Sequence, residues 1–507
     1  MATALYRRRR SGNVWIVAIC LVLVAPLFVC ALPPLADYPN HLARAFVLSA
    51  LPGDPVLNRM YAADWSVIPN LGLDLVMPPL MHWLPALTVG RLVVGAAVLL
   101  PVLGVVAYHR ALRAGEAWWS LGGCLTAYAG CLLYGFLNFV LSLGLALLLA
   151  AAWLSWRETR PKATVLLAAV GAVALFTCHL MGLVFFGVLI GAAELSRLWP
   201  FRLTEALKRG GVLLLVFIVP AVLYRVSALA ELGGDAQWLP WGRKLLQLET
   251  GFIAYDPWLD GLSVLIAFGV PLAALACRRG RVPPASAWAI ALLAAAYLVT
   301  PYAWKGTFQI DTRLAVMLAM MMFAGFAPVD WPRWARRAGQ VAIAGVFLGR
   351  MALVLLGWWD QRAVLASLRA AMAPLRPGQT VMVADASPAE APAYWAKDPY
   401  RLRLANGVTL SAHFGALTLI ERRAWWPFEF DNPSQQPMRT REPYRALALR
   451  AAELPDRTRL LTMDLSGFDD VLLTNAEAVP PLPADRFTRL AGSGFAVLYA
   501  IRDRRPD

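Results

Sequence analysis

Residues 14–44 read VWIVAICLVLVAPLFVCALPPLADYPNHLAR, an apolar run that ends in a short polar stretch. Four consecutive arginines at positions 7–10 precede the apolar part. This order also suits a signal peptide, but Ala31-Leu32-Pro33 is a poor cleavage site, which favours an uncleaved first span. Basic residues collect on the cytoplasmic side of a span. The stretch therefore predicts a membrane protein whose N-terminus is cytoplasmic.

The rest of the chain repeats the apolar pattern. Its 507 residues are 59% hydrophobic and 16% charged, and the mean hydropathy is +0.56, which is too apolar for an ordinary soluble domain. Windows of about 20 apolar residues predict eleven spans. They are residues 13–32, 89–108, 117–134, 137–156, 163–178, 181–196, 210–229, 261–277, 285–302, 313–329 and 338–358. The junctions near Tyr134–Asn138 and Cys178–Gly182 are short enough for tight turns or broken helices.

The positive charge follows membrane topology rather than nucleic-acid binding. The net charge is +15, and the basic residues gather in short loops between the predicted spans. With the N-terminus inside, the inner segments hold 19 lysines and arginines and the outer segments hold 8. An odd number of spans then places the C-terminus outside. The six cysteines lie within spans or at their edges, which predicts no structural disulfide and no cysteine-based metal site.

The expected fold is mainly α-helical: a polytopic transmembrane domain of about eleven helices, residues 1–358, and then a small α/β domain, residues 359–507. The first outer segment, 33–88, contains the apolar but proline-broken stretch 71–84, which predicts interfacial helices. In the C-terminal domain we expect strands at 380–384, 470–474 and 495–501 and helices at 363–373, 410–423 and 443–453. The adjacent Trp425 and Trp426 suit either an interface or a packing anchor.

The polar stretch after the first span holds an acid, a base and a cation. Pro39 is well placed to open a helix, so Asp37, His41 and Arg44 fall at i, i+4 and i+7 on one helical face. Placing ionisable groups at a membrane surface costs free energy, so their presence suggests a functional role. The alternative is that Asp37 only caps the helix while the other two side chains are solvated.

Other unexplained polar residues are expected at the same outer level, which makes them candidates for a shared site. They are Asn70, Asp74, Asn138, His179, Arg225, Lys305, Asp311 and Arg313. Asp74 offers a second acid near the first, or else the wet edge of an interfacial helix. His179 suits a site or a structural hydrogen bond. Lys305, Asp311 and Arg313 suit a phosphate site or a plain ion pair, and Arg225 suits a lipid phosphate, an internal acid or a snorkelling head group.

No Walker A loop, dinucleotide fingerprint, HExxH or serine elbow is present in the sequence. A group-transfer enzyme of this kind would draw its energy from an activated lipid rather than from ATP.

In layout, residues 1–358 resemble the bacterial GT-C superfamily of integral-membrane glycosyltransferases. A first span delivers the acid of residues 37–44 to the first outer loop, interfacial helices follow, and a soluble domain comes last. The 69–75 stretch PNLGLDL also looks like bacterial membrane proteins of this broad type. The resemblance implies a polyprenyl-phosphate-linked sugar donor, a glycan, lipid or protein acceptor, and a place in the bacterial inner membrane with the C-terminal domain in the periplasm.

The resemblance also implies roles for residues. Asp37 matches the first-loop acid that acts as catalytic base, and His41 would assist it or bind phosphate. Arg44, Arg225, Lys305 and Arg313 would contact the donor phosphate. The loop lacks the adjacent acid pairs of several subfamilies, so the use of a divalent cation, Mg²⁺ or Mn²⁺, stays open, with Asp37 and Asp74 as its candidate ligands. Two alternatives remain: a transporter or flippase for a lipid-linked glycan, and a non-catalytic assembly subunit.

Overall fold

The computed structural model describes residues 2–113, 117–305, 307–387 and 402–502. The side chains of residues 2–12 and of residue 231 are also outside this description, so the basic cluster at 7–10 is known only as part of a helix. The chain is mainly helical with a small C-terminal sheet. Its contacts divide it into two compact units. Following the topology expected from the sequence, we call residues 1–26, 67–72 and 94–354 the membrane unit, and residues 27–66, 73–93 and 355–507 the outer unit.

Each predicted span contains helical structure, but only six helices are long and apolar enough to cross a membrane among the described residues. They are α6 (Ala86–Leu112), α8 (Leu137–Trp156), α9 (Pro161–Cys178), α11 (Leu203–Arg225), the continuous segment Pro257–Ala276 and α18 (Arg333–Met372). The chain therefore has the helices of a membrane protein, while the predicted count of eleven spans is not confirmed.

Other helical elements lie among the described residues outside these six. They are α1 (Ala2–Val24), α2 (Pro26–Val29), α5 (Gly72–Met81), η1 (Trp119–Thr126), α7 (Gly130–Leu133), α10 (Leu180–Leu195), α12 (Ala228–Glu231), α13 (Trp241–Leu246), η2 (Gln247–Gly251), α16 (Pro284–Val299) and α17 (Ile310–Ala324). Pro257–Ala276 consists of α14 (Pro257–Val264), the π-helical η3 (Leu265–Gly269) and α15 (Val270–Ala276). Two short strands, β2 (Gly280–Arg281) and β3 (Ala327–Pro328), pair antiparallel.

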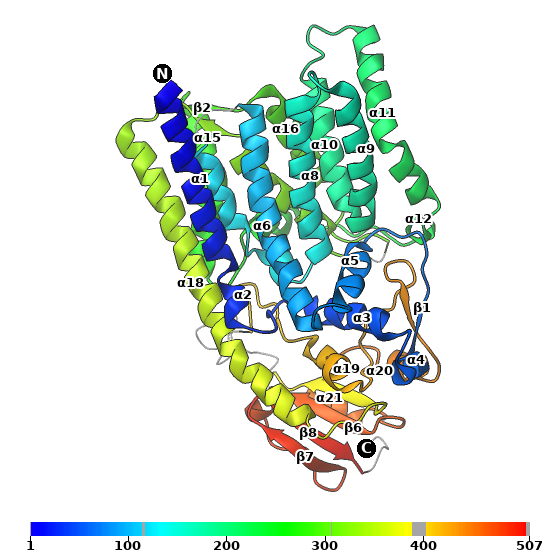
Figure 1. Ribbon diagram of the computed structural model, residues 1–507. Coiled ribbons are helices and arrows are strands. Elements are labelled where there is room, and N and C mark those ends of the chain that lie inside the picture. Colours follow the sequence, from blue (N-terminus) through cyan, green and yellow to red (C-terminus); the bar gives the residue numbers. More distant parts are fainter. Residues whose placement is uncertain (1, 114–116, 306, 388–401, 503–507) are drawn as a thin grey trace. The chain divides into compact units, whose positions relative to one another are not determined.

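Close helix packing forms the core of the membrane unit. Helices α8, α9, α10 and α16 lie side by side (Figure 1). A Cβ added at Gly144 of α8 would come within 2.6 Å of the backbone of Pro101 in α6, and one at Gly182 of α10 would meet Ser142 of α8 at 2.2 Å. Glycines at these crossings let the helices approach closely, as is usual in membrane bundles.

One predicted span differs from expectation. Residues 117–134 do not form one helix: a 3-10 segment, η1, is followed by the single turn α7. Glycine weakens an α-helix, and η1 carries two adjacent glycines, Gly122 and Gly123. Their added Cβ atoms would meet Phe323 and Val105 at 2.5 and 2.9 Å, respectively. Tight packing explains why glycine occupies these positions, and the low helix propensity of glycine is consistent with the irregular helix.

Helix α11 shows the surface expected of a lipid-facing segment. Only 11% of its apolar window is buried within the molecule. Leu207, Leu214, Leu215 and Val222 are all more than half exposed. A contiguous apolar face of this size needs a non-aqueous neighbour, which a bilayer supplies.

The outer unit is built on a four-stranded sheet of order β4-β6-β8-β7. Its strands are β4 (Val381–Asp385), β6 (Asp470–Thr474), β7 (Phe487–Ser493) and β8 (Ala496–Ile501). Strands β4 and β6 are parallel, and the other pairs are antiparallel. The parallel pair needs a long crossover, and this crossover carries η5 (Phe414–Ala416), α19 (Leu417–Arg422), β5 (Met438–Thr440), α20 (Tyr444–Ala451) and α21 (Arg457–Thr462).

Most of the predicted C-terminal elements are present. The strands expected at 380–384, 470–474 and 495–501 match β4, β6 and β8, and the helix expected at 443–453 matches α20. Only residues 417–422 of the helix expected at 410–423 are α-helical, and residues 363–372 of the helix expected at 363–373 form the end of the 40-residue α18. Trp425 and Trp426 are buried, at 1% and 0% exposed, so they are packing anchors.

The first outer segment belongs to the same unit as this sheet. It contains α3 (Tyr38–Ala50), α4 (Pro55–Met60) and β1 (Tyr61–Ala63). Strand β1 pairs antiparallel with β5, with Tyr61 opposite Thr440. Asp54 caps α4 through the N–H groups of Val56 and Leu57 and also accepts a hydrogen bond from Arg423. The outer unit thus joins two parts of the chain that are far apart in sequence.

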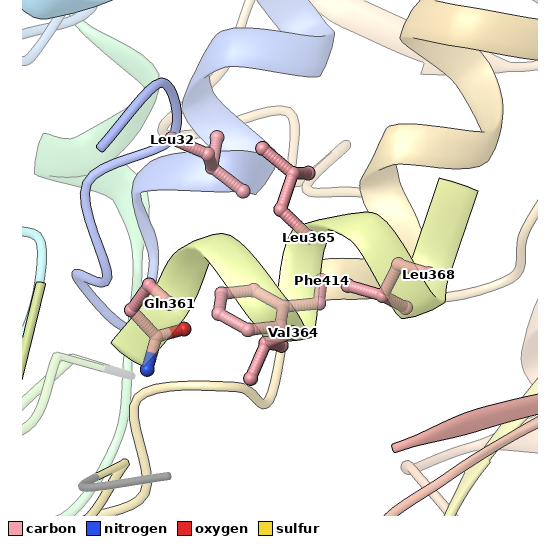
Figure 2. A pocket seen from close by; sticks show the side chains of 6 residues that line it. All are labelled: Leu32, Gln361, Val364, Leu365, Leu368 and Phe414. Carbon is pink, nitrogen blue, oxygen red and sulfur yellow. The ribbon is translucent and has the colours of Figure 1, made fainter. Parts of the chain in front are cut away.

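A small apolar pocket lies between residue Leu32, helix α18 and η5 (Figure 2). Gln361 is the only polar residue that lines it, beside Val364, Leu365, Leu368 and Phe414. Because it has no charged group, this pocket offers little for chemistry, and the polar candidates lie elsewhere.

Candidate functional site

Asp37 stands directly before α3, as expected from Pro39, which occupies the first turn of that helix. The side chain of Asp37 makes no capping hydrogen bond, and only its backbone carbonyl accepts from His41 N, at 3.2 Å. His41 and Arg44 are buried, at 9% and 0% exposed. The alternative that Asp37 only caps the helix while His41 and Arg44 are solvated is therefore wrong.

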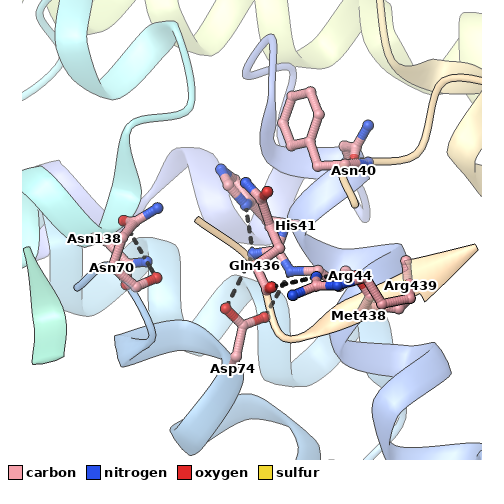
Figure 3. Close-up of polar contacts among 10 residues, drawn as sticks. Asn40, His41, Arg44, Asn70, Asp74, Asn138, Gln436, Met438 and Arg439 are labelled. Carbon is pink, nitrogen blue, oxygen red and sulfur yellow. Dashed lines mark hydrogen bonds and ion pairs between the residues drawn. The ribbon is translucent and has the colours of Figure 1, made fainter. Parts of the chain in front are cut away.

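Arg44 forms a buried ion pair with Asp74, the acid in the first turn of α5 (Figure 3). Arg44 Nε donates to Asp74 Oδ1 at 2.7 Å, and Arg44 Nη2 donates to Asp74 Oδ2 at 3.2 Å. Both side chains are 0% exposed, so Asp74 is not the wet edge of an interfacial helix. The fork geometry satisfies both carboxylate oxygens, as bidentate arginine pairs do.

The same guanidinium fixes the state of His41. Arg44 Nη2 lies 3.1 Å from His41 Nδ1. An arginine can only donate, so Nδ1 must accept, and the imidazole is neutral with its proton on Nε2. Burial, and then the nearby Arg44 and His413, hold the pKa of His41 well below its ordinary value of 6.5. His41 is thus a neutral donor through Nε2 at physiological pH.

A second histidine, His413, contacts the leading acid. His413 Nε2 lies 3.4 Å from Asp37 Oδ1. On the other side of the ring, Asn40 Nδ2 lies 3.1 Å from His413 Nδ1. The rings of His41 and His413 both pack against Phe430, with centroid separations of 5.6 and 5.0 Å. Helix α3 and the crossover of the C-terminal sheet therefore build one cluster.

The backbone fixes the orientation of the Asn40 amide. Phe430 N–H donates to Asn40 Oδ1 at 2.9 Å, and Asn40 Nδ2 donates to the carbonyl of Phe428 at 2.7 Å. The second N–H of Asn40 therefore points at His413 Nδ1, which must accept it. The remaining proton of a neutral imidazole is then on Nε2, the atom that faces Asp37.

Burial sets the protonation states of this pair. It raises the pKa of Asp37 from 3.8 to about 7 and lowers the pKa of His413 from 6.5 to about 4. The Asp37 side chain still keeps 26% of its surface exposed. A reachable carboxyl group with a pKa near the working pH has the properties of a general base.

Glu429 is a third acid in the outer unit. It is 8% exposed, and burial raises its pKa from 4.5 to about 8. Trp426 Nε1 donates to its Oε2 at 3.1 Å, whereas its Oε1 has no hydrogen-bond partner. Arg44 Nη1 also lacks a partner. Among the described residues of the cluster, Glu429 Oε1 and Arg44 Nη1 are thus available to a polar ligand or to water.

The sequence alone missed Asn40, His413 and Glu429. Asn40 lies inside the polar stretch 37–44, and His413 is one of only five histidines in the chain, so both were visible as unusual residues. Glu429 follows the Trp425-Trp426 pair. Nothing local links either C-terminal residue to Asp37.

In the membrane unit, Asn138 and His179 have structural contacts. Asn138 Nδ2 donates to the carbonyl and to the side chain of Asn70, at 2.8 and 2.9 Å (Figure 3). Asn70 precedes α5 and has a φ of 75°, so it lies outside the helix that carries Asp74. His179 lies at the predicted break between α9 and α10, where its Nδ1 accepts from Met181 N–H at 3.1 Å.

The expected trio of Lys305, Asp311 and Arg313 is not a single cluster. The ion-pair partner of Asp311 is Lys244, with 3.7 Å between Nζ and Oδ2. Lys305 Nζ donates instead to the carbonyl of Ala230 at 3.1 Å. Lys244 is the residue that sequence reasoning missed, because α13 is short and far from α17 in the chain.

Arg313 and Arg225 have different surroundings. The Arg313 guanidinium lies over the rings of Phe136 and Phe139, with 5.3 and 5.9 Å to their centroids. No acid among the described residues pairs with Arg313, and its Nε is buried without a partner. Arg225 is exposed at the C-terminal end of α11, a position that suits a cation.

A metal site is not evident in the described part of the chain, where no group of three or more His, Cys, Asp or Glu side chains gathers. Both oxygens of Asp74 accept from Arg44. The use of Mg²⁺ or Mn²⁺ stays a prediction.

Asp37, His41, Arg44 and Asp74 therefore lie in one hydrogen-bonded and packed cluster of the outer unit. His179 lies in the membrane unit, so its convergence with them stays a prediction. Comparisons with known protein families and with curated protein sequences found no match.

Proposed function

We propose that this protein is an integral-membrane glycosyltransferase that moves a sugar from a polyprenyl-phosphate donor to an acceptor hydroxyl at the periplasmic face of a bacterial inner membrane. The observation that carries the proposal is the state of Asp37. It is a partly exposed carboxyl group of the first loop after the N-terminal apolar segment, its pKa is about 7, and its side chain makes no capping hydrogen bond.

The proposed chemistry is a single displacement. Asp37 takes the proton of the acceptor hydroxyl, whose oxygen forms a bond to the anomeric carbon. The bond from that carbon to the phosphate oxygen breaks, and polyprenyl phosphate leaves with the electron pair. A cation must offset the charge on this leaving group. The unpartnered Nη1 of Arg44 is the candidate in the outer unit, and the expected phosphate contact of Arg313 in the membrane unit stays a separate prediction.

The surface of the membrane unit supports a lipid donor. The exposed leucines and valines of α11 provide a face on which a polyprenyl chain is as soluble as it is in the bilayer. The finer expectations also remain part of this proposal: a GT-C-like arrangement of about eleven spans, an envelope glycan, lipid or protein as acceptor, and an optional divalent cation.

Substitution of Asp37 tests the proposal. Asp37→Asn keeps the shape of the side chain and removes the base, so we expect loss of the cell-surface glycan at an unchanged level of membrane-inserted protein. Asp64→Asn is the matched control. Asp64 lies in the same outer segment, pairs with Arg439 at 3.2 Å and has 61% of its side chain exposed.

The outcomes separate the alternatives. A normal glycan in Asp37→Asn cells would rule out the catalytic role and leave an assembly subunit. A transporter would leave the glycosylated lipid intact but on the wrong side of the membrane. Labelling of lipid-linked sugars on intact spheroplasts of Asp37→Asn cells with a membrane-impermeant reagent distinguishes these cases, because a blocked transferase accumulates its donor on the outer face.

A further inference from the structure

We propose that His413 is a positioning residue that holds Asp37 Oδ1, so that Oδ2 is the oxygen that takes the acceptor proton. This inference rests on the proposed function of Asp37. The C-terminal region then completes the catalytic site rather than only covering it, because the acid and its partner come from opposite ends of the chain.

The hydrogen-bond order gives the direction of the contact. Two backbone groups fix the Asn40 amide, the amide donates to His413 Nδ1, and the imidazole proton is thereby held on Nε2. The Nε2 atom lies 3.4 Å from Asp37 Oδ1, which is ion-pair range rather than a formed hydrogen bond. We infer that a donor this close favours one orientation of the carboxyl group and leaves Oδ2 available. Orienting groups of this kind commonly fix catalytic side chains.

His413 is itself unsuited to act as the base. Its Nδ1 lone pair accepts from Asn40, and its Nε2 carries the proton. Its side chain is 19% exposed and packs edge-on against Phe430 and Trp426. Its influence on a substrate must therefore pass through Asp37.

Other titratable and charged groups near Asp37 also affect its pKa. From α3 itself come His41, which is neutral, and Arg44. From α5 comes Asp74, whose charge is offset by Arg44. The crossover contributes Glu429, which burial keeps protonated at neutral pH. Removing the His413 donor therefore changes the environment of Asp37 without removing a counter-charge.

The experiment titrates Asp37 directly in the full-length protein in lipid nanodiscs. Infrared difference spectra, with Asp37→Asn as the reference, report the carboxyl protonation state across pH 5–9. His413→Phe keeps an apolar ring but removes the donor. We expect it to raise the pKa of Asp37 by about one unit, because the ionised carboxylate loses a nearby N–H donor.

A conservative variant and a control complete the design. His413→Gln can place an amide N–H near the position of Nε2, so we expect the pKa and the surface glycan to return toward wild type. His82→Phe is the control, because His82 is exposed and should leave both readouts unchanged. Protein level and melting temperature exclude a folding defect.

The inference fails if His413→Phe leaves the Asp37 titration unchanged, or if His413→Gln behaves like His413→Phe. The proposed function fails separately, if Asp37→Asn cells keep their glycan. A shifted titration with a normal glycan in Asp37→Asn would retain the contact between the two residues and reject its catalytic use.

Discussion

Arg44 and Asp74 form a two-bond ion pair with no exposed surface, although they come from different helices. Removal of one partner of a buried pair leaves an uncompensated charge and costs about 3–5 kcal/mol. We expect Asp74→Asn to lower the melting temperature of the purified protein. Thermal unfolding monitored by tryptophan fluorescence measures this change. The double variant Arg44→Met/Asp74→Leu should lose much less, because both charges are gone. A double variant less stable than Asp74→Asn would contradict this prediction.

The titration of Asp37 predicts a pH-dependent cost to folding. Its pKa is about 7 in the folded protein against 3.8 ordinarily, so the folded state binds the proton more tightly. The folded state is then favoured below pH 4, and this contribution is lost as the pH rises toward 7. Asp37→Asn should therefore be more stable than wild type at pH 8, with a smaller difference at pH 5. Thermal unfolding of both proteins at the two pH values measures this difference in stability. The same difference at pH 5 and pH 8 would contradict the raised pKa of Asp37.

The same titration predicts the pH dependence of transfer. The base works only when ionised, so the rate should increase as the pH rises through about 7. The checking measurement is sugar transfer by membranes that contain the protein, incubated with their own labelled lipid-linked donors. A rate that is already maximal at pH 5 would argue against Asp37 as the base.

Arg313 should matter for function more than for stability. Its guanidinium rests on Phe136 and Phe139 without an acid among the described residues, and a cation–π contact is worth about 0.5–2 kcal/mol. We expect Arg313→Gln to reduce the surface glycan at least tenfold with only a small fall in melting temperature. Arg243→Gln, at an exposed arginine, is the control. A normal glycan in Arg313→Gln would exclude a phosphate-binding role.

Pairing of β1 with β5 can be tested by cross-linking. Arg441 N–H donates to the carbonyl of Met60, and Asp64 N–H donates to that of Pro437. In this register Ala63 and Met438 face each other as a non-hydrogen-bonded pair, the closer of the two kinds. Cysteines at these two positions should form a disulfide under mild oxidation, detected by mass spectrometry. Ala62→Cys with Met438→Cys is out of register and should link poorly; equal linking would contradict the pairing.

Local patterns in the sequence predicted the local structure well. Apolar windows placed the helices, Pro39 marked the start of α3, and the break at His179 was expected from the short spans beside it. Strand β6 matches its predicted residues 470–474 because a short, fully buried apolar run has few alternatives. Residues 117–134 form a 3-10 segment and a short α-turn rather than one regular helix, which hydropathy does not reveal.

The sequence predicted part of the candidate site near the start of α3, but not the partners from the C-terminal region. Asp37, His41 and Arg44 share a local motif, so helical periodicity brought them together. Their partner His413 is 373 residues away from Asn40 in the chain, and no periodicity reports a contact of that range. The same holds for Asp311, whose cation proved to be Lys244 rather than the neighbouring Lys305. Opposite charges close in sequence are weak evidence for an ion pair, because the packing of the helices decides which side chains meet.

The strand pair β1–β5 also has a consequence for biosynthesis. Tyr61 accepts a hydrogen bond from Arg441, 380 residues later in the chain. At about 5–20 residues per second, a ribosome needs roughly 20–80 s to make this interval. Throughout that time β1 has an unpaired edge, and α3 lacks the C-terminal residues that bury its polar face. We therefore expect chaperones to bind the nascent first loop. In truncated chains this loop would stay accessible to proteases.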